Sequence, residues 1–317
     1  MMFDLDAIST DLKKTVSKTE QFKYAVSVLD ISRENRRLGH TDNVIITGDS
    51  GVGKSHLVKA YRRQHASYDE NVRTIVPVVV VSLSGKTTQL GCIQAILEAM
   101  GDKFWNKGSS RECTSKLYGL LRDNGVQMVI VDEAHNALNA KSMNPSVAMT
   151  LKGINNNTNT SIVLAGIHRV LEYRLDPELN RRFQRVINYT FMDYRTTEQV
   201  DEFKQLICDM AKVLPVSNVS ELSTKCWVDR FFLASEGSPD LVYTMLFEGI
   251  RYIEKGETKM SLAHVQKACL GSESLKSKVD IFEYQDETII KLLKEFHDTK
   301  GSAQPVGEIV RKMLKRI

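Results

Sequence analysis

The sequence predicts an α/β fold, with a five-stranded parallel sheet flanked by helices and followed by a small all-α domain. Short apolar runs rich in β-branched residues alternate with segments of helical spacing as far as residue 192. Such alternation is typical of a parallel sheet whose strands are joined by right-handed helical crossovers. From about Asp193 onward the spacing of apolar residues is helical, and no strand pattern intervenes. The 317 residues are enough for about two domains.

The composition is that of a water-soluble globular protein, with 42% hydrophobic and 26% charged residues. The formal net charge of +4 is too small to prove or exclude nucleic-acid binding. The acidic start of the chain lacks the apolar core of a signal peptide, and the longest apolar run, 76–81, is too short to span a membrane. Five cysteines show neither zinc-ligand spacing nor the even number of a disulfide framework. We therefore expect a cytoplasmic protein that makes no contact with a membrane.

Five strands are expected in the α/β part, each a run of mostly apolar and β-branched residues. These strands are 43–47, 74–82, 127–131, 161–165 and 185–191. The helices expected in this part are 1–40, 56–64, 88–100 and 111–124. An Asn-rich loop is expected at 155–159, before the fourth strand.

The N-terminal helical segment has an apolar stripe that includes Phe22, Ala25, Val26 and Leu29. Two interpretations remain open for this stripe. It forms a surface for an adenine ring or a neighbouring subunit, or it packs on the core of its own chain.

After residue 193, helices are expected at 198–213, 227–235, 239–253 and 261–270. An amphipathic segment, 281–296, and a basic end, 311–316, follow them. The basic end is interpreted either as a docking peptide for a partner protein or as a terminal helix, with a slight preference for docking.

The segment from Gly48 to Ser55 matches the P-loop pattern G-x-x-x-x-G-K-[ST], between an expected strand and an expected helix. Its glycines allow the backbone N–H groups to point at a phosphate, and the helix that follows adds the positive end of its dipole. Lys54 is expected to reach the β- and γ-phosphates of ATP, and the Ser55 hydroxyl to bind Mg²⁺. The residues expected to contact the nucleotide are Gly48, Asp49, Ser50, Gly51, Val52, Gly53, Lys54, Ser55 and His56.

A second motif is the apolar strand that ends in Asp132 and Glu133, which is the Walker B pattern. Asp132 is expected to hold Mg²⁺, directly or through water. Glu133 is expected to act as the general base that polarises the attacking water. His135 either reports the state of the nucleotide or forms a structural hydrogen bond.

A third motif, Leu-Asn-Arg-Arg-Phe, ends at Phe183, before the last expected strand. An arginine at this point is a candidate arginine finger, which stabilises charge on the transferring phosphoryl group of an adjacent subunit. We favour Arg182 over Arg181. The expected catalytic residues are thus Lys54, Glu133 and Arg182.

Two loops around the expected helix 88–100 combine glycine, lysine and hydroxyl side chains, at 84–88 and 107–111. Such side chains suit contacts to a phosphate backbone, which would be independent of sequence and sensitive to salt. Composition alone equally allows two ordinary solvated loops.

Together, the motifs resemble those of the AAA+ ATPases. Within that superfamily, the stretches Val-Ser-Leu-Ser-Gly-Lys-Thr-Thr-Gln-Leu, Val-Ile-Val-Asp-Glu-Ala-His-Asn-Ala-Leu and Ala-Gly-Ile-His-Arg-Val-Leu resemble the TniB/TnsC group, the ATPase regulators of DNA transposition. This group is related in role to the phage Mu target-selection ATPase. The resemblance covers roughly residues 44–253.

The resemblance implies assembly with ATP as a ring or filament around duplex DNA, recruitment of a transposase, and contact with a target-selection protein. It places DNA contacts at Lys86, Thr87, Thr88, Lys107 and Ser109. The pattern along the chain divides it into an N-terminal helical segment (1–40), a nucleotide-binding domain (41–192), an all-α part (193–272), which the resemblance identifies as a helical lid, and a C-terminal helical and basic tail (273–317).

The sequence departs from the common AAA+ pattern at two positions. The fourth strand leads into Gly166, Ile167 and His168, so either His168 replaces the usual polar sensor or that sensor is missing. The lid motif lacks its arginine, because Gly237 is followed by Ser-Pro-Asp. Both departures favour slow hydrolysis, as in a switch rather than a motor.

Two other functions remain open. One is a replication initiator or helicase loader of the same superfamily, which would carry a C-terminal winged helix. The other is an interaction scaffold that never touches DNA.

Overall fold

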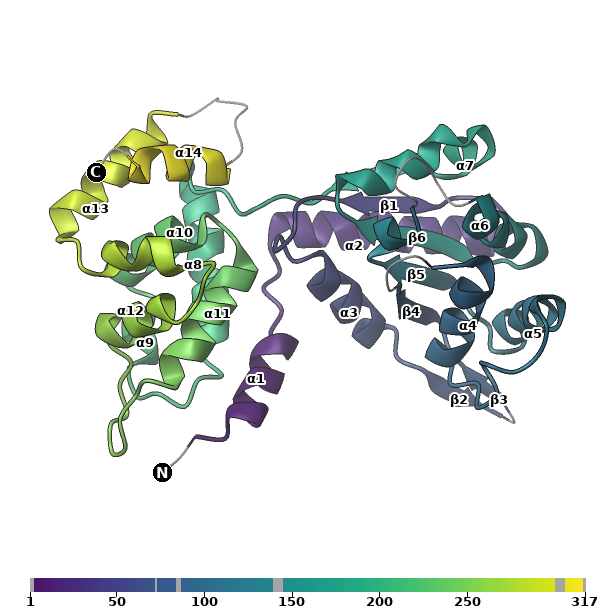
Figure 1. The fold of residues 1–317 in the computed structure, drawn as a ribbon, viewed down its shortest axis with the longest axis horizontal. Helices are drawn as coiled ribbons and strands as arrows, with labels where there is room; N and C mark the ends of the chain where they lie inside the picture. Colours follow the sequence, from purple (N-terminus) through teal and green to yellow (C-terminus); the bar gives the residue numbers. More distant parts are fainter. Residues whose placement is uncertain (1–2, 72, 84–86, 139–144, 300–305, 316–317) are drawn as a thin grey trace. The chain divides into compact units, whose positions relative to one another are not determined.

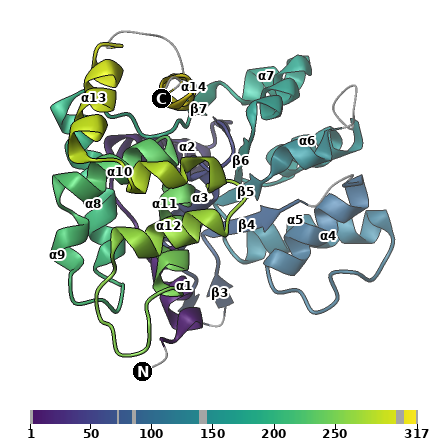
Figure 2. The same cartoon turned by 60° about the vertical axis from the view of Figure 1, so that its left-hand side comes forward.

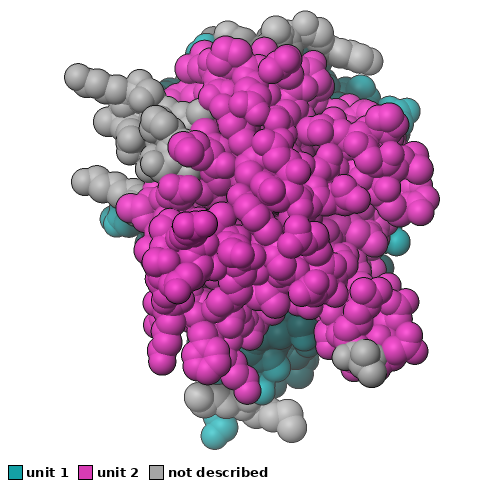
Figure 3. Space-filling view, turned by 90° about the vertical axis from the view of Figure 1, so that its right-hand side faces the viewer, with its two compact units in different colours: residues 1–19, 51–53, 190–317 teal, residues 20–50, 54–189 magenta. Residues whose placement is uncertain are grey.

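The computed structural model describes residues 3–71, 73–83, 87–138, 145–299 and 306–315. The chain divides into two compact units (Figure 3). One unit, here called the sheet unit, comprises Glu20–Ser50 and Lys54–Tyr189. The other, the helical unit, comprises Met1–Thr19, Gly51–Gly53 and Thr190–Ile317. The expected lid and tail thus lie in the same compact unit, together with the first residues of the chain.

The sheet unit contains a five-stranded parallel sheet with the strand order β4-β5-β6-β1-β7 (Figure 1). This confirms the predicted fold class. The β-branched runs form strands because their side chains are buried on the sheet, as the burial of every residue in β1 and β6 shows. The strands are β1 (Val44–Thr47), β4 (Val78–Ser82), β5 (Met128–Asp132), β6 (Ser161–Gly166) and β7 (Arg185–Asn188).

The register of the strands sets where the motifs lie. Thr47, the last residue of β1, pairs with Gly166 at the end of β6, and Asp132 pairs with Ser82 at the end of β4. Because all these strands are parallel, the segments that follow β1, β5 and β6 leave the sheet at one edge. The P-loop, the Walker B motif and His168 therefore begin at the same edge.

Helices cover both faces of this sheet. Alternate strand residues such as Ile45, Val129 and Leu164 form one apolar cluster with the helices α4, α5 and α6. Helices α2 and α3 contact the strands but contribute nothing to that cluster, so they pack on the opposite face (Figure 1). The helices of this unit are α2 (Glu20–Arg37), α3 (Lys54–Gln64), α4 (Gln89–Ala99), α5 (Ser110–Asp123), α6 (Pro145–Asn157) and α7 (Pro177–Arg182), with the 3-10 helices η1 (Ala134–Ala137) and η2 (His168–Leu175).

The apolar stripe of the N-terminal segment is a core face. Phe22, Ala25 and Leu29 of α2 are buried. Of the two interpretations of this stripe, packing on the core of the chain is the one that the structure supports.

Two expected elements of the sheet unit were wrong. The expected strand 74–82 is divided at Pro77, which cannot donate a ladder hydrogen bond. Its first part belongs to an antiparallel hairpin of β2 (Tyr68–Glu70) and β3 (Arg73–Ile75). The expected Asn-rich loop is also wrong, because Asn155–Asn157 form the last turn of α6. Asparagine disfavours helices by less than 1 kcal/mol, and the burial of Leu151 and Ile154 outweighs that preference.

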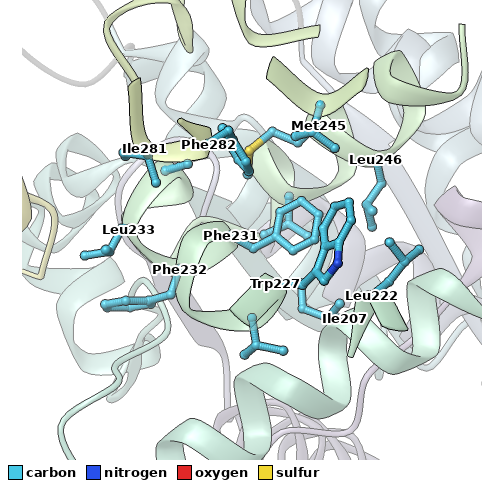
Figure 4. Packing of buried hydrophobic residues seen from close by; sticks show 14 of the residues in the cluster. Ile207, Leu222, Trp227, Phe231, Phe232, Leu233, Met245, Leu246, Ile281 and Phe282 are labelled. Atoms are coloured by element: carbon cyan, nitrogen blue, oxygen red, sulfur yellow. The ribbon is translucent and has the colours of Figure 1, made fainter. Parts of the chain in front are cut away.

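The helical unit is built around α10, which carries Trp227, Phe231 and Phe232 into a common apolar core (Figure 4). The expected helices of this part are present with shifted ends. The helices are α1 (Leu5–Lys14), α8 (Thr197–Ala211), α9 (Val219–Leu222), α10 (Lys225–Ser235), α11 (Pro239–Ile250), α12 (Leu262–Leu270), α13 (Asp286–His297) and α14 (Val306–Leu314), with η3 (Lys276–Phe282) (Figure 2).

The C-terminal tail contributes to this core. Phe296 of α13 and Val310 of α14 are fully buried in it. Glu236, at the end of α10, forms ion pairs with Lys278 and with Arg311 of α14. The apolar face of α14 is therefore covered by its own chain, so the basic end is a packed terminal helix, contrary to the preference for a docking peptide.

Within the described part of the chain, no helix combines the length and apolarity needed to cross a membrane.

Candidate nucleotide-binding site

The P-loop joins β1 to α3 and depends on glycine at several positions. A Cβ atom at Gly48 would lie 1.9 Å from the carbonyl oxygen of Tyr189, so no side chain fits there. Gly51 and Gly53 adopt φ values of 81° and 101°, which other residues rarely adopt. Ser55 and His56, both partly exposed, lie in the first turn of α3. The loop thus has the curled backbone that a phosphate cradle requires.

Lys54 is buried, and its ammonium group faces the loop. Its Nζ donates hydrogen bonds to the carbonyl oxygens of Gly48 (2.8 Å) and Asp49 (2.7 Å). Burial lowers the pKa of Lys54, while the charges of Glu133, Asp132 and Asp49 oppose that shift. Lys54 therefore shares one electrostatic environment with the two Walker B acids, although 77 or more residues of sequence separate them.

The Walker B acids end β5, two strands away from β1. Asp132 is buried, whereas the Glu133 side chain is 42% exposed. The N–H of Glu133 donates to Asp132 Oδ1 at 3.0 Å. Glu133 is one of three described non-glycine residues with positive φ, at 53°. The chain thus turns sharply after Asp132, which separates the directions of the two carboxylates.

The donor set suits Mg²⁺. Ser55 and Asp132 offer a hydroxyl and a carboxylate oxygen, and such hard oxygen ligands, completed by phosphate oxygens and water, are those that Mg²⁺ prefers. Within the described residues no cluster of three or more His, Cys, Asp or Glu side chains forms a cage for a metal ion.

His168 lies where a polar sensor is expected. Its Nδ1 is 3.3 Å from the hydroxyl oxygen of Thr47, and its Nε2 is 3.6 Å from Asp49 Oδ1. The imidazole thus joins the end of β6 to the end of β1 and the start of the P-loop. Of the two possibilities left by the sequence, the geometry favours His168 as the polar group at this position.

The lid motif has a capping role. Gly237 has a φ of 78°, and the Ser238 hydroxyl accepts a hydrogen bond from the N–H of Leu241 in the first turn of α11. No arginine stands in this turn, because Pro239 and Asp240 follow Ser238.

Arg182 is held within its own helix. Its Nη2 donates to Glu178 Oε1 at 2.6 Å, and its side chain is only 18% exposed. Glu178 also forms an ion pair with Lys152, with 3.1 Å between Lys152 Nζ and Glu178 Oε2. Arg181, in contrast, is exposed and forms no ion pair with other described residues. An arginine finger at position 182 must therefore leave Glu178 to act on another subunit.

The residues expected to contact DNA fall into three groups. Lys86 lies outside the described residues. Thr88 and Ser109 are N-caps whose hydroxyls accept hydrogen bonds from the N–H groups of Gly91 and Glu112, respectively. Thr87 is partly exposed beside Thr88. Lys107 is exposed in the loop between α4 and α5.

Phe104 shares this loop with Lys107 and was missed by the sequence analysis. Its ring is 58% exposed, and Lys107 Nζ lies 5.5 Å from the centre of the ring. An aromatic residue between two lysines, Lys103 and Lys107, is the sequence signal that could have found it. The pair combines a positive charge with a flat apolar surface.

A cavity of about 600 Å³ lies at the opposite edge of the sheet, before β5 and β6. Arg36, Arg37 and Arg122 line it. Arg36 donates to the backbone oxygens of Asn155 and Thr158, at the end of α6. Its guanidinium thereby satisfies carbonyl groups that a helix end leaves unpaired, so Arg36 is explained by helix capping.

Comparison with known proteins decides the family. The family model for the Bacterial TniB protein matches residues 14–191, more than half of the chain. The chain belongs to the TniB family. No curated protein sequence matches this TniB-family chain significantly.

Solved structures with a similar fold include three origin-recognition proteins. The Aeropyrum pernix ORC2 protein in ADPNP–ADP complexes has a TM-score of 0.59 at 12% identity, covering 92% of this chain and 93% of that chain. The Aeropyrum pernix ORC1 protein in complex with DNA has a TM-score of 0.56 at 15% identity, with coverages of 94% and 82%. Drosophila ORC bound to DNA has a TM-score of 0.51 at 12% identity, with coverages of 99% and 78%.

At these identities the likeness concerns the fold, which is that of AAA+ ATPases. The TniB family, this fold and the two Walker motifs together make the chain an AAA+ P-loop ATPase.

Proposed function

We propose that this TniB-family ATPase is an ATP-dependent, DNA-binding regulator of transposition. It assembles on duplex target DNA as a ring or filament, recruits and activates a transposase, and disassembles when ATP is hydrolysed. The observation that carries this proposal is the complete Walker site in a TniB-family chain, at one edge of the sheet. The DNA-bound origin-recognition proteins of similar fold support the DNA-binding part.

ATP with Mg²⁺ is the ligand of this site in the proposal. The backbone of Gly48–Ser55 cradles the phosphates, and Lys54 exchanges its two carbonyl partners for phosphate oxygens. Ser55 and Asp132 hold Mg²⁺, which neutralises phosphate charge. Glu133 orients the attacking water as the general base.

Arg182 completes the site of an adjacent subunit. Its ion pair with Glu178 is partly exposed and lies within one helix, and such pairs contribute at most about 1 kcal/mol. A γ-phosphate with its greater charge can therefore replace Glu178 as the partner of Arg182. Burial, and then the charge of Arg182, lower the pKa of Arg36.

Duplex DNA is bound through its backbone, without sequence preference. Lys107 supplies a phosphate contact, and Phe104 supports its charge. Thr88 and Ser109 remain proposed contacts in addition to their capping roles, because a hydroxyl whose oxygen accepts from a backbone N–H can still donate its own O–H to a phosphate oxygen. Lys86 and Thr87 complete the proposed set. The partners are a transposase and a target-selection protein, in the cytoplasm.

The alternative is a replication initiator or helicase loader, favoured by the fold of the origin-recognition proteins. A winged helix requires strands, and the described residues after β7 form none. A scaffold that never touches DNA is the other alternative. Loss of duplex binding in a Lys86→Ala, Lys107→Ala double variant would argue against the scaffold.

Negative-stain microscopy with duplex DNA tests the proposal. ATP is expected to produce DNA-bound assemblies of wild-type protein, and Glu133→Gln to keep them intact for longer. Lys59→Ala, a change at an exposed lysine one turn after Ser55 in α3, serves as the control. Absence of assemblies under all nucleotide conditions would contradict the proposal.

A further inference from the structure

The turn that carries Glu133 is fixed by side-chain hydrogen bonds to two other segments. The Tyr173 hydroxyl donates to the carbonyl oxygen of Ala134 at 3.0 Å. The Asn136 side-chain amide donates to the carbonyl oxygen of Leu83 at 2.8 Å. η1, which begins one residue after Glu133, is therefore a rigid base for the side chains around it.

His135 of this turn faces back toward Glu133. Its Nε2 lies 3.3 Å from Glu133 Oε2, and its side chain is 15% exposed. Its Nδ1 is buried and has no hydrogen-bond partner among the described residues. A proton on Nδ1 would be a buried donor without an acceptor, which costs about 1–3 kcal/mol. The neutral ring therefore carries its proton on Nε2, where it can donate to the carboxylate.

Gly166 fixes the other edge of this imidazole. A Cβ atom at Gly166 would lie 2.8 Å from His135 Nδ1, closer than real Cβ contacts. The other atoms near that position also belong to His135. The absence of a side chain at the end of β6 thus leaves room for the ring, whose Nε2 lies 3.3 Å from Glu133 Oε2.

We propose that His135 is a positioning residue that orients the Glu133 carboxylate for attack by water, with Gly166 providing the space for its ring. This inference rests on the proposed role of Glu133 as general base. A half-exposed glutamate samples several rotamers, and only some of them direct an oxygen at the water. An imidazole whose Nε2 lies 3.3 Å from Glu133 Oε2 restricts that choice before ATP reacts.

The test measures kcat and KM for ATP hydrolysis by the full chain on duplex DNA. His135→Ala is expected to lower kcat about tenfold with KM unchanged, because the residue touches the base and not the nucleotide. His135→Gln keeps a donor and is expected to restore part of kcat. His135→Phe keeps a ring without a donor and is expected to be as slow as His135→Ala.

The Gly166→Ala variant tests whether Gly166 acts through the His135 ring or through the structure of β6 in general. Alone, it is expected to lower kcat by displacing the ring. In the His135→Ala background it is expected to change nothing further, because the ring that it meets is gone. Independent losses in the double variant would overturn the role of Gly166.

Thermal unfolding and ATP affinity are measured for each variant to show that the fold and the nucleotide site persist. A higher kcat in His135→Ala would overturn the proposal, since it would mean that the ring holds the base away from the water. Equal activity of His135→Ala and His135→Gln would overturn it as well. Full activity of Glu133→Gln would instead show that Glu133 is not the general base. That result would contradict the proposed function, and it is distinguishable from a failure of the role of His135. If Gly166→Ala does not fold, the three His135 variants still decide.

Discussion

The turn after β5 and the short helix α7 carry the two groups that act on the γ-phosphate in the proposed reaction. The first group, Glu133, lies on a turn that hydrogen bonds from Tyr173 and Asn136 fix to other parts of the sheet unit. The second, Arg182, is held by an ion pair within its own helix. In a single subunit the proposed base, Glu133, is therefore fixed in place. Arg182 is instead paired with Glu178, a partner that a phosphate can replace.

In this account one chain alone supplies the nucleotide-binding residues, whereas hydrolysis also needs the arginine of a second chain. In the proposed site, the nucleotide-binding residues of one subunit come from the ends of β1, β5 and β6, from the loops after them and from the first turn of α3. The arginine belongs to a segment that begins after η2 and returns to the start of β1, where the N–H of Asn43 bonds the carbonyl oxygen of Arg182. This comparison predicts that a monomer can bind nucleotide and that efficient hydrolysis requires the assembly.

Lys54→Ala is expected to have the largest effect. Removing a buried ammonium group from the phosphate cradle is expected to weaken ATP binding on the order of a hundredfold, and assembly on DNA with it. Equilibrium binding of a fluorescent ATP analogue measures this, with Lys59→Ala as the control. Unchanged affinity in Lys54→Ala would contradict the assignment of the P-loop.

Arg182→Ala is expected to leave ATP affinity unchanged and to lower hydrolysis in the assembled state on the order of a thousandfold, as for other arginine fingers. Arg181→Ala is the matched control, one residue away on the same helix and exposed. Turnover is measured at protein concentrations above and below assembly. If Arg181→Ala loses turnover and Arg182→Ala keeps it, the finger is Arg181.

Lys107→Ala is expected to weaken duplex binding several-fold and to reduce the slope of log affinity against log salt by about one. Lys103→Ala, also exposed in the same loop, is the control. Titrations at several salt concentrations measure both. An equal loss in the two variants would show that the loop contributes general charge and not a specific phosphate contact.

Ser109→Ala is expected to have the smallest effect. It removes one half of a capping box with Glu112 and should lower the free energy of unfolding by about 1 kcal/mol. Denaturant unfolding measures the loss. A change in the salt slope of DNA binding beyond that of Lys103→Ala would show that Ser109 also contacts phosphate.

Much of the sheet unit was predictable because its strands are buried β-branched runs and because the P-loop has a fixed spacing. The helix α6 was not, since its final turn is rich in asparagine and is held by contacts with residues far away in the sequence. Arg182 was predicted as a candidate arginine finger, but its ion pair with Glu178 was not predicted. Glu178 stands four residues before it, the spacing of a helical ion pair, so the sequence itself contained the signal for its resting partner.

The capping roles of Thr88 and Ser109 show the same limit. A Ser-x-x-Glu pattern at residues 109–112 predicts a helix start. The basic loop beside it also fits a DNA contact, and Ser109 was assigned to that contact alone. The contact between His135 and Glu133 had no sequence signal, because the sharp turn at Glu133 and the empty space at Gly166 come from separate strands.

A mixing experiment tests the shared site most directly. Lys54→Ala protein is expected to bind ATP only weakly but keeps Arg182, whereas Arg182→Ala protein is expected to bind ATP but lacks the arginine. Each alone is expected to be nearly inactive on duplex DNA. Their mixture is expected to hydrolyse ATP, because Arg182 of one subunit reaches the nucleotide of the other. A mixture no more active than its two components would contradict a site completed between subunits.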